Sequence, residues 1–532
     1  MSRIYFLLLS FFSTSLLAQT SIVSLQSVSN YNQWGWDAVV MQNGIVTIAT
    51  VPAIGARVMQ YDLGSLKSIM VNPSLFSKTY VPAENGIWYN FGGYKTWPSP
   101  QASWNAGGWP PPPTLDYGAY SITDTSRTND SVSISVASQI EQWYAPDIQF
   151  VRRATMYSGT SRIKMEQTIV NHGTSDTAWG VWSIIQSIVN HPGKTDYQNF
   201  WSYFPLNPNS VFGSSGVGMP QGKCNAWKGE VVPGIYGVQF DPDNNKVFAD
   251  PESGWIAYAD LSDSVVFART FPVFDGMQYP DGGARVSVYV SSPASSSAPA
   301  YMEVEVKGPL VDLAANGGQY TFTENWWAAK VRAPILDVDS VGAAGERLSY
   351  NTSTHVMSAA YGVFYKGTAN LVFLDSQGNT VAEGQSHSVS PMEEFQLEEP
   401  ITIPDSTKFV QVQVHDSTGS FMGILESKEI SQLLTVINAK LPPATSQYRL
   451  SPNYPNPFNP GTVISFSCPT VTHGSLKIYD ILGREVAQLA SRNFPAGQHS
   501  YSWNPENLAS GVYIVEFRTE NIRLTQKVVY IR

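Results

Sequence analysis

The chain has 532 residues, several times the length of an ordinary domain, which predicts two to four domains. Charged residues make up 14% of it and aromatic residues 12%, while 41 Gly and 35 Pro supply frequent turns, a composition that favours β-strands over long helices. The net charge of −10 argues against nucleic acid or an anionic membrane as a partner, because binding phosphate requires clustered Lys and Arg.

The first segment predicts export from the cytoplasm. Arg3 supplies a positive charge, residues 4–17 are apolar or carry small hydroxyls, and Ala18 is a small residue after which a signal peptide over residues 1–18 would be cleaved. The apolar run is shorter than the ~20 residues that span a bilayer, and no comparable run follows, so we expect no transmembrane segment in the mature chain. Because Cys224 and Cys468 fall in different predicted domains, we expect no disulfide between them.

Tryptophan marks the extent of the largest predicted domain. Fourteen of the 15 Trp lie between Trp34 and Trp327, which sets a boundary near residue 332 and predicts one domain over residues 19–332. Short runs of alternating apolar residues, such as residues 286–290 and 301–306, predict β-strands within it.

Two motifs in this domain carry a resemblance to a known fold. Residues 55–58, Gly-Ala-Arg-Val, resemble an early element of the galactose-mutarotase-like supersandwich. Residues 90–101, together with residues 108–111 and Trp326, resemble an uncharacterised bacterial family of that superfold over about residues 42–330. The resemblance implies an all-β supersandwich with a concave sheet face that binds sugar.

An independent physical argument points to the same ligand. Sugars stack their C–H faces on aromatic rings and need fixed polar partners for their hydroxyls. Residues 88–109 combine both kinds of side chain in a Gly- and Pro-rich segment that we expect to lie outside the core strands. The alternative is that these Trp cover the core of the sandwich. The predicted substrate-binding residues are Arg57, Asn90, Lys95, Trp97, Gln101 and Trp109.

A mutarotase-like reaction would need a carboxylate base and a His acid within reach of one sugar. The period of two in residues 301–307 puts Glu303 and Glu305 on one face of a strand, which makes them the candidate bases; the alternative is a solvated face. His191, in Asn-His-Pro-Gly, is the candidate acid, and the alternative is a structural turn His. Residues 178–186 resemble the strand on which mutarotases place a catalytic His but contain none, which counts against epimerase activity.

Other catalytic motifs do not occur in the sequence. It has no Gly-x-Ser-x-Gly nucleophile elbow, no Cys or His set at metal-ligand spacing and no phosphate-binding Gly loop. We therefore expect neither a cofactor nor a metal.

The residue pattern of the sequence changes after the Trp-rich domain. Residues 333–440 contain alternating runs such as residues 369–374 and 409–414, separated by turn-forming residues, which predicts a small β-sandwich. Residues 441–460 are rich in Pro and Asn, so we expect an extended linker there instead of a strand.

The last domain, residues 461–532 with the motif that precedes it, carries the second resemblance. Residues 450–460 (Leu-Ser-Pro-Asn-Tyr-Pro-Asn-Pro-Phe-Asn-Pro), 478–486 (Ile-Tyr-Asp-Ile-Leu-Gly-Arg-Glu-Val) and 508–513 (Leu-Ala-Ser-Gly-Val-Tyr) resemble the type A C-terminal sorting domain of type IX secretion substrates. The resemblance implies an immunoglobulin-like sandwich that contacts the type IX machinery. It also implies export to the periplasm and then to the outer-membrane surface or the medium.

Three functions remain open on the sequence. The leading one is a secreted or cell-surface protein that recognises a mono-, oligo- or polysaccharide. The second is an enzyme of the aldose 1-epimerase type or one that processes polysaccharide. The third is a non-catalytic structural or adhesive surface protein.

Overall fold

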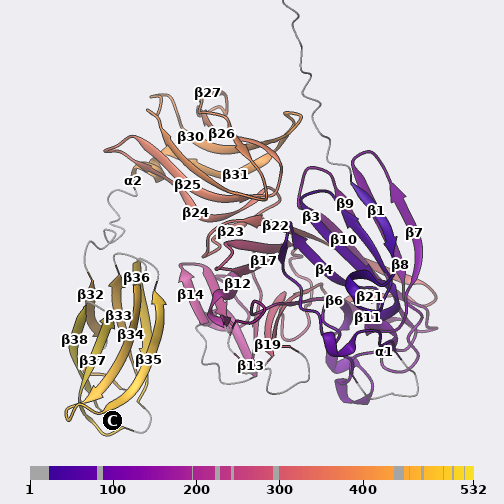
Figure 1. Cartoon of the computed structure of the whole chain (residues 1–532), viewed down its shortest axis with the longest axis horizontal. Helices are drawn as coiled ribbons and strands as arrows, with labels where there is room; N and C mark the ends of the chain where they lie inside the picture. Colours follow the sequence, from indigo (N-terminus) through magenta and orange to yellow (C-terminus); the bar gives the residue numbers. More distant parts are fainter. Residues whose placement is uncertain are drawn as a thin grey trace, which may run out of the picture. The chain divides into compact units, whose positions relative to one another are not determined.

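The computed structural model describes residues 23–531 except for 81–87, 195, 222–227, 241, 243–244, 292–298, 436–447, 455, 460, 469–471, 495–496, 506–507 and 520–521. The predicted signal peptide lies outside the described residues. Within them the chain consists of β-strands, 3-10 turns and two short α-helices, α1 (Pro113–Asp116) and α2 (Ile430–Thr435), which confirms the all-β fold class. The chain forms two compact units, Met1–Ile430 and Ser431–Arg532 (Figure 1).

A 12-stranded sheet, here the first sheet, forms one layer of the Trp-rich region (Figure 1). Its main path is antiparallel, and β5 (Leu66–Lys67) and β21 (Val311–Leu313) pair beside it with β4 and β11. The order along the path is β1 (Ser24–Val28), β2 (Ala38–Gln42), β3 (Val46–Val51), β4 (Arg57–Leu63), β6 (Tyr94–Ser99), β11 (Thr177–Ser187), β20 (Tyr301–Lys307), β19 (Val286–Ser291), β16 (Asn245–Ala249) and β13 (Val217–Gln221).

A 10-stranded sheet, the second sheet, forms the facing layer. Its order is β14 (Lys228–Val232), β15 (Ile235–Gln239), β12 (Phe200–Pro205), β17 (Trp255–Asp260), β18 (Val265–Thr270), β22 (Gly318–Lys330), β10 (Ile163–Asn171), β9 (Ile148–Tyr157), β8 (Ser131–Ala137) and β7 (Ser121–Arg127).

Apolar side chains from the two sheets form one buried core. On β20, Met302, Val304 and Val306 belong to it, together with Phe150 and Phe322 of the second sheet. Because successive side chains of a strand point to opposite faces, the alternate residues of β20 point away from the second sheet. The core therefore determines which side chains occupy the outer face of the first sheet.

One strand of the first sheet differs from the expectation for residues 88–109. We expected this segment to lie outside the core strands, yet β6 is a buried strand between β4 and β11. It contains Pro98, which lacks the N–H of a regular ladder. β4 pairs with β6 only at Tyr94, so the rest of β6 has an unpaired edge, which is where a sheet accommodates Pro.

A small β-sandwich follows the Trp-rich region within the first unit. One of its sheets has the order β23 (Asp337–Val338), β24 (Gly342–Asn351), β25 (Val356–Val363) and β29 (Glu394–Pro400). The other has the order β27 (Thr380–Glu383), β26 (Gly367–Leu374), β30 (Phe409–Asp416) and β31 (Phe421–Glu429), with β28 (His387–Val389) also paired to β26. We call it the middle sandwich.

The middle sandwich shares a core with the second sheet. The ring of Trp327, on β22, stacks on Phe364 with 4.9 Å between centroids, and both side chains are buried. Ile335 and Val338 extend the same cluster, and the Thr160 hydroxyl donates a 2.7 Å hydrogen bond to the Phe364 carbonyl. The two sandwiches therefore form one packed body.

The second unit is a sandwich of two small sheets, for which the immunoglobulin-like connectivity stays a prediction. One has the order β32 (Arg449–Tyr454), β33 (Thr462–Cys468) and β36 (Gly497–Trp503). The other has the order β35 (Glu485–Phe494), β34 (Thr472–Asp480), β37 (Gly511–Thr519) and β38 (Arg523–Tyr530). Phe466, Phe494 and Phe517 form its core.

The linker expected over residues 441–460 is wrong in its second half. Arg449–Tyr454 forms β32, which pairs with β33, while residues 441–447 lie outside the described residues. Pro452 falls at a register shift on this edge strand, and a bulge on an edge is a position in a sheet that accommodates Pro.

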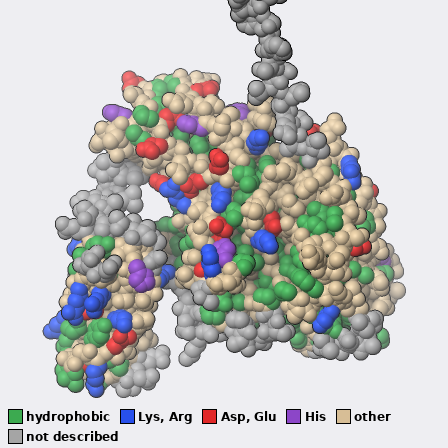
Figure 2. Space-filling view, in the orientation of Figure 1, with side chains coloured by type: hydrophobic (Ala, Val, Ile, Leu, Met, Phe, Trp, Pro, Cys, Tyr) green, Lys and Arg blue, Asp and Glu red, His purple; other side chains and the backbone are tan. Residues whose placement is uncertain are grey.

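Two further features are the surface charge and the length of the helices. On the face of the first unit shown in Figure 2, acidic and basic side chains are scattered, as the 14% charged composition leads us to expect. None of the helices in the described part of the chain is long and apolar enough to cross a membrane.

The contact between Trp327 and Phe364 yields a stability prediction. Replacing Phe364→Ala leaves a cavity at a fully buried site, so the free energy of unfolding of the first unit should fall by about 3–5 kcal/mol. Denaturant unfolding followed by Trp fluorescence reports on this unit, which holds 14 of the 15 Trp. Phe421→Ala, at a ring that is 53% exposed, is the control and should change the value by less than ~0.5 kcal/mol. Equal effects of the two substitutions would contradict the shared core.

Candidate functional site

Strands β6, β11 and β20 align their outward-pointing residues in rows. Trp97, Trp182 and Lys307 form one row, and Lys95 and Glu305 belong to the next. All of these side chains are buried although they lie on the side of the sheet away from the second sheet. We call this set the outer face; it comprises Lys95, Trp97, Trp182, Gln186, Glu303, Glu305 and Lys307.

Glu303 is held by two neighbours on the outer face. Its Oε1 accepts hydrogen bonds from Lys95 Nζ at 3.0 Å and from Gln186 Nε2 at 2.9 Å. Its second oxygen, Oε2, accepts none of the hydrogen bonds found among the described residues. Burial lowers the pKa of Lys95, and the charge of Glu303 opposes that shift. Glu303 therefore keeps an oxygen that a ligand can use.

Glu305, two residues further along β20, is more completely enclosed. Its Oε2 accepts hydrogen bonds from Trp182 Nε1 at 2.9 Å and from the Ser287 hydroxyl, and Lys246 Nζ lies 3.0 Å from Oε1. Burial raises the pKa of Glu305, but Lys246 and Lys307 outweigh it, and the net shift is downward. Burial, followed by repulsion from Lys246, lowers the pKa of Lys307 to about 8. Of the two predicted bases, Glu305 is fully buried beside Lys246, whereas Glu303 is 6% exposed.

Asp116, at the end of α1, fixes two indoles beside the outer face. Its Oδ1 accepts a 2.6 Å hydrogen bond from Arg57 Nη2 and a 2.7 Å bond from Trp97 Nε1, and its Oδ2 accepts a 3.0 Å bond from Trp88 Nε1. Arg57 and Asp116 are both fully buried. Arg57 therefore orients Asp116, and Trp97, which is 4% exposed, offers little ring surface to solvent.

Trp109 is the predicted binding residue with an accessible ring. It is 48% exposed and packs edge-to-face on Trp88, with 5.1 Å between centroids. The Gln101 side chain holds the loop before it through a 2.7 Å hydrogen bond to the Gly108 carbonyl. Asn90 is 7% exposed, and its side-chain amide lies near the Tyr301 hydroxyl. Glu303 and Asn90 both lie close enough to the Tyr301 hydroxyl to affect its pKa.

The structure thus brings together most of the predicted site residues and adds several more. Arg57, Lys95, Trp97, Trp109 and Glu303 are linked through direct contacts or through Asp116 and Trp88. Trp88 belongs to the predicted segment 88–109 but was not among the predicted binding residues. The residues that sequence reasoning missed are Asp116, Trp182, Gln186, Lys246, Ser287 and Lys307. Lys307 could have been predicted from the sequence, because the alternation that places Glu303 and Glu305 on one face of the strand places Lys307 there too.

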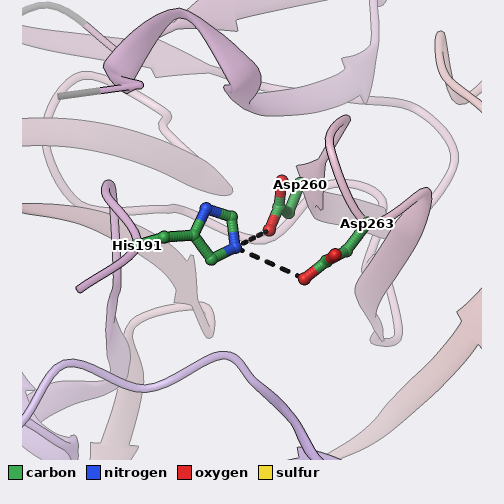
Figure 3. Close-up of side chains that lie close together, drawn as sticks. All are labelled: His191, Asp260 and Asp263. Atoms are coloured by element: carbon green, nitrogen blue, oxygen red, sulfur yellow. Dashed lines mark hydrogen bonds and ion pairs between the residues drawn. The ribbon is translucent and has the colours of Figure 1, made fainter. Parts of the chain in front are cut away.

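His191 lies in a different cluster, which Figure 3 shows in part. Its Nδ1 lies 2.7 Å from Asp196 Oδ2, and its Nε2 lies 3.0 Å from Asp260 and 3.3 Å from Asp263. In the described part of the chain its polar contacts are with these carboxylates, so the structure does not bring it to Glu303. Ligand atoms of His191, Asp260 and Asp263 lie within 4.8 Å of one another, an arrangement that could hold a divalent ion.

The His191 cluster predicts a pH dependence of stability. Burial lowers the pKa of His191, but hydrogen bonding to Asp196 and the charge of Asp260 outweigh it, so the pKa is raised above its usual value near 6.5. A raised folded-state pKa gives stabilisation that is fully present below the unfolded-state pKa and is lost as the pH rises through the folded-state value. The free energy of unfolding should therefore fall as the pH rises from about 6.5 through the higher folded-state pKa, and His191→Gln should flatten this slope. His172→Gln, at an exposed His, is the control. Equal slopes in wild type and His191→Gln would refute the pairing.

Comparisons with known proteins bear first on the second unit. Residues 453–531 match the family described as a secretion system C-terminal sorting domain. The match begins within β32 and includes all of β38. A comparison with curated proteins found no match.

Solved structures similar to this chain cover its N-terminal region. They include a galactose mutarotase-like protein from Clostridium acetobutylicum, which is 9% identical, with a TM-score of 0.38 and coverage of 58% of this chain and 99% of that one. A galactose mutarotase-like protein from Lactobacillus casei is 11% identical, with a TM-score of 0.36 and coverage of 55% and 99%. A protein from Synechocystis is 10% identical, with a TM-score of 0.38 and coverage of 62% and 100%.

The sorting-domain match covers the region that the three C-terminal motifs predict. Such a domain directs export by type IX secretion. Residues 453–531 are a secretion system C-terminal sorting domain, and this domain indicates export to the cell surface or the extracellular space.

Proposed function

We propose that the outer face of the first sheet, with the loop that carries Trp109, is the carbohydrate-recognition site of this exported protein. The observation that carries the proposal is the half-exposed ring of Trp109, which packs on Trp88 and Trp97. Lys95, the partner of Glu303, lies against the rings of the same two Trp. An indole supplies the flat apolar surface on which the C–H face of a sugar stacks. Fixed polar groups next to it suit sugar hydroxyls.

Two polar atoms support the proposal further. Glu303 Oε2 is an acceptor that takes part in none of the hydrogen bonds found among the described residues, and Asn90 Nδ2 is a buried donor near the Tyr301 hydroxyl. A sugar hydroxyl both donates and accepts, so a polyol is a ligand that matches both atoms.

The charge of the region favours an uncharged ligand. Four cations pair with four carboxylates in Arg57–Asp116, Lys95–Glu303, Lys246–Glu305 and Lys307–Asp281. These four pairs carry no net charge, which favours an uncharged ligand over phosphate or sulfate.

Trp109→Ala tests the carbohydrate site. We expect the mature chain to bind at least one neutral glycan on an array, and the substitution to weaken that binding at least about tenfold, which corresponds to ~1.4 kcal/mol. The loss of a stacking platform is the physical reason. Phe421→Ala, which removes an exposed ring from the middle sandwich, should leave binding unchanged. An array without any bound glycan would favour the structural or adhesive role instead.

One observation favours an enzyme as the second candidate. Glu303 has an oxygen without a hydrogen-bond partner among the described residues and lies 3.0 Å from Lys95, whose pKa burial lowers. In an anomer interconversion Glu303 would take the proton of the anomeric hydroxyl, and the Lys95 ammonium would donate one to the ring oxygen. This pairing supplies an acid and a base without His191.

The enzyme candidate makes a kinetic prediction. If Glu303 is the base, Glu303→Gln should slow anomer interconversion by a factor of about 10²–10⁴, measured by NMR exchange spectroscopy on a bound sugar. Glu166→Gln, on the second sheet, is the matched control and should retain the wild-type rate. A wild-type rate equal to that in buffer would remove the enzyme candidate and leave recognition as the function.

A further inference from the structure

We infer that the ligand is an extended glycan chain, bound across Trp109 and a second exposed indole, Trp143; this inference rests on the proposed carbohydrate site. Trp143 is 75% exposed, more than any other large apolar side chain in the described part of the molecule. An indole so accessible buries little apolar surface in the folded protein, so packing does not account for it.

The loop that carries Trp143 is held rigidly by a buried carboxylate. Glu141 is 1% exposed, and its Oε1 accepts hydrogen bonds from the backbone N–H groups of Gln142 at 3.0 Å, Trp143 at 2.9 Å and Tyr144 at 3.3 Å. Its Oε2 accepts a 3.2 Å bond from the N–H of Thr114, in α1. The backbone beneath the exposed indole is therefore fixed before any ligand arrives, which reduces the entropy lost on binding.

The same loop is joined to the loop of Trp109. The N–H of Asn105 donates a 2.9 Å hydrogen bond to the Tyr144 carbonyl, and the Asn105 side chain donates to the Trp143 carbonyl. Asn105 precedes Trp109 by four residues, so their Cα atoms lie within about 14 Å of each other. Trp109 and Trp143 thus stand on adjoining loops.

The two loops also connect to the buried charges of the site. Glu141 bonds to Thr114 in α1, and α1 ends in Asp116, which holds Trp97 and Trp88. Trp88 in turn packs against Trp109. A continuous set of contacts therefore runs from the outer face to Trp143.

This arrangement fits a chain of sugars better than one sugar. A single sugar ring covers a single indole, so a monosaccharide seated beside Glu303 and Trp109 would leave Trp143 unused. Successive rings of a glycan can stack on successive indoles, and each contact adds to the affinity. The exposed polar side chains nearby include Asn105 and Gln142, which carry no charge, and Asp147, whose negative charge disfavours an acidic polymer.

A length series tests the inference. Isothermal titration of the mature chain with oligosaccharides of increasing length, built from the glycan that the array identifies, should show affinity rising at least tenfold from the monosaccharide to the longest member. Trp143→Ala should abolish that gain and leave monosaccharide affinity within about twofold of wild type. Trp109→Ala should weaken binding at every length, and Phe421→Ala should change neither.

The outcomes separate the inference from the proposed function. Glycan binding with an undiminished length gain in Trp143→Ala overturns the extended-chain inference and leaves the carbohydrate site in place. Affinity that does not depend on length in the wild type overturns it as well. Failure of the wild type to bind any glycan overturns the proposed function, and the extended-chain inference with it.

Discussion

The buried ion pairs of the outer face are the constraint on which the rest of the Trp-rich region depends. A buried charge without a partner is strongly destabilising, and breaking one such pair typically costs 3–5 kcal/mol. Each cation on this face therefore needs its carboxylate at bonding distance. Helix α1 meets this need for Arg57 by placing Asp116 2.6 Å away, and β20 meets it for Lys95 through Glu303.

A second buried pair supports the same strands from the inside of the sandwich. Arg269, on β18, bonds to Glu324 on β22 and donates hydrogen bonds to the carbonyls of Ser183 at 3.2 Å and Val304 at 2.8 Å. These carbonyls belong to β11 and β20, the strands that carry Gln186 and Glu303 on their other side. The polar groups of the site are thus fixed by bonds from both layers, which keeps a binding surface preorganised.

The sequence could predict those features that are determined by residues close together in the chain. The alternation of apolar residues along residues 301–307 is enough to place Glu303 and Glu305 together, because one face of that strand has to enter the core. The sorting domain was predictable as well, because each of its three motifs is a short continuous stretch of the sequence. The linker expectation failed because Pro452 was taken to prevent pairing, whereas an edge strand with a bulge accommodates it.

The rest of the site depends on contacts between distant parts of the chain. Asp116 lies in a Pro-rich segment that gives no sign of its role, and it becomes important only because Arg57, 59 positions earlier, needs a counter-ion. Lys246 reaches Glu305 only through the order of β16, β19 and β20 in the sheet. His191 occurs in a turn-like tetrad, and its pairing with Asp260 depends on the second sheet. Such pairings follow from sheet order and register, which a single sequence does not reveal.

The aromatic stack of Trp327 on Phe364 has a mechanical consequence for a protein displayed outside the cell. A protein outside the cell experiences mechanical force whenever the surrounding fluid moves. With a shared core, that load is spread over the interlocked rings of two sandwiches and does not fall on the single strand of chain that crosses between them. The two sandwiches then respond to such a force as one packed body.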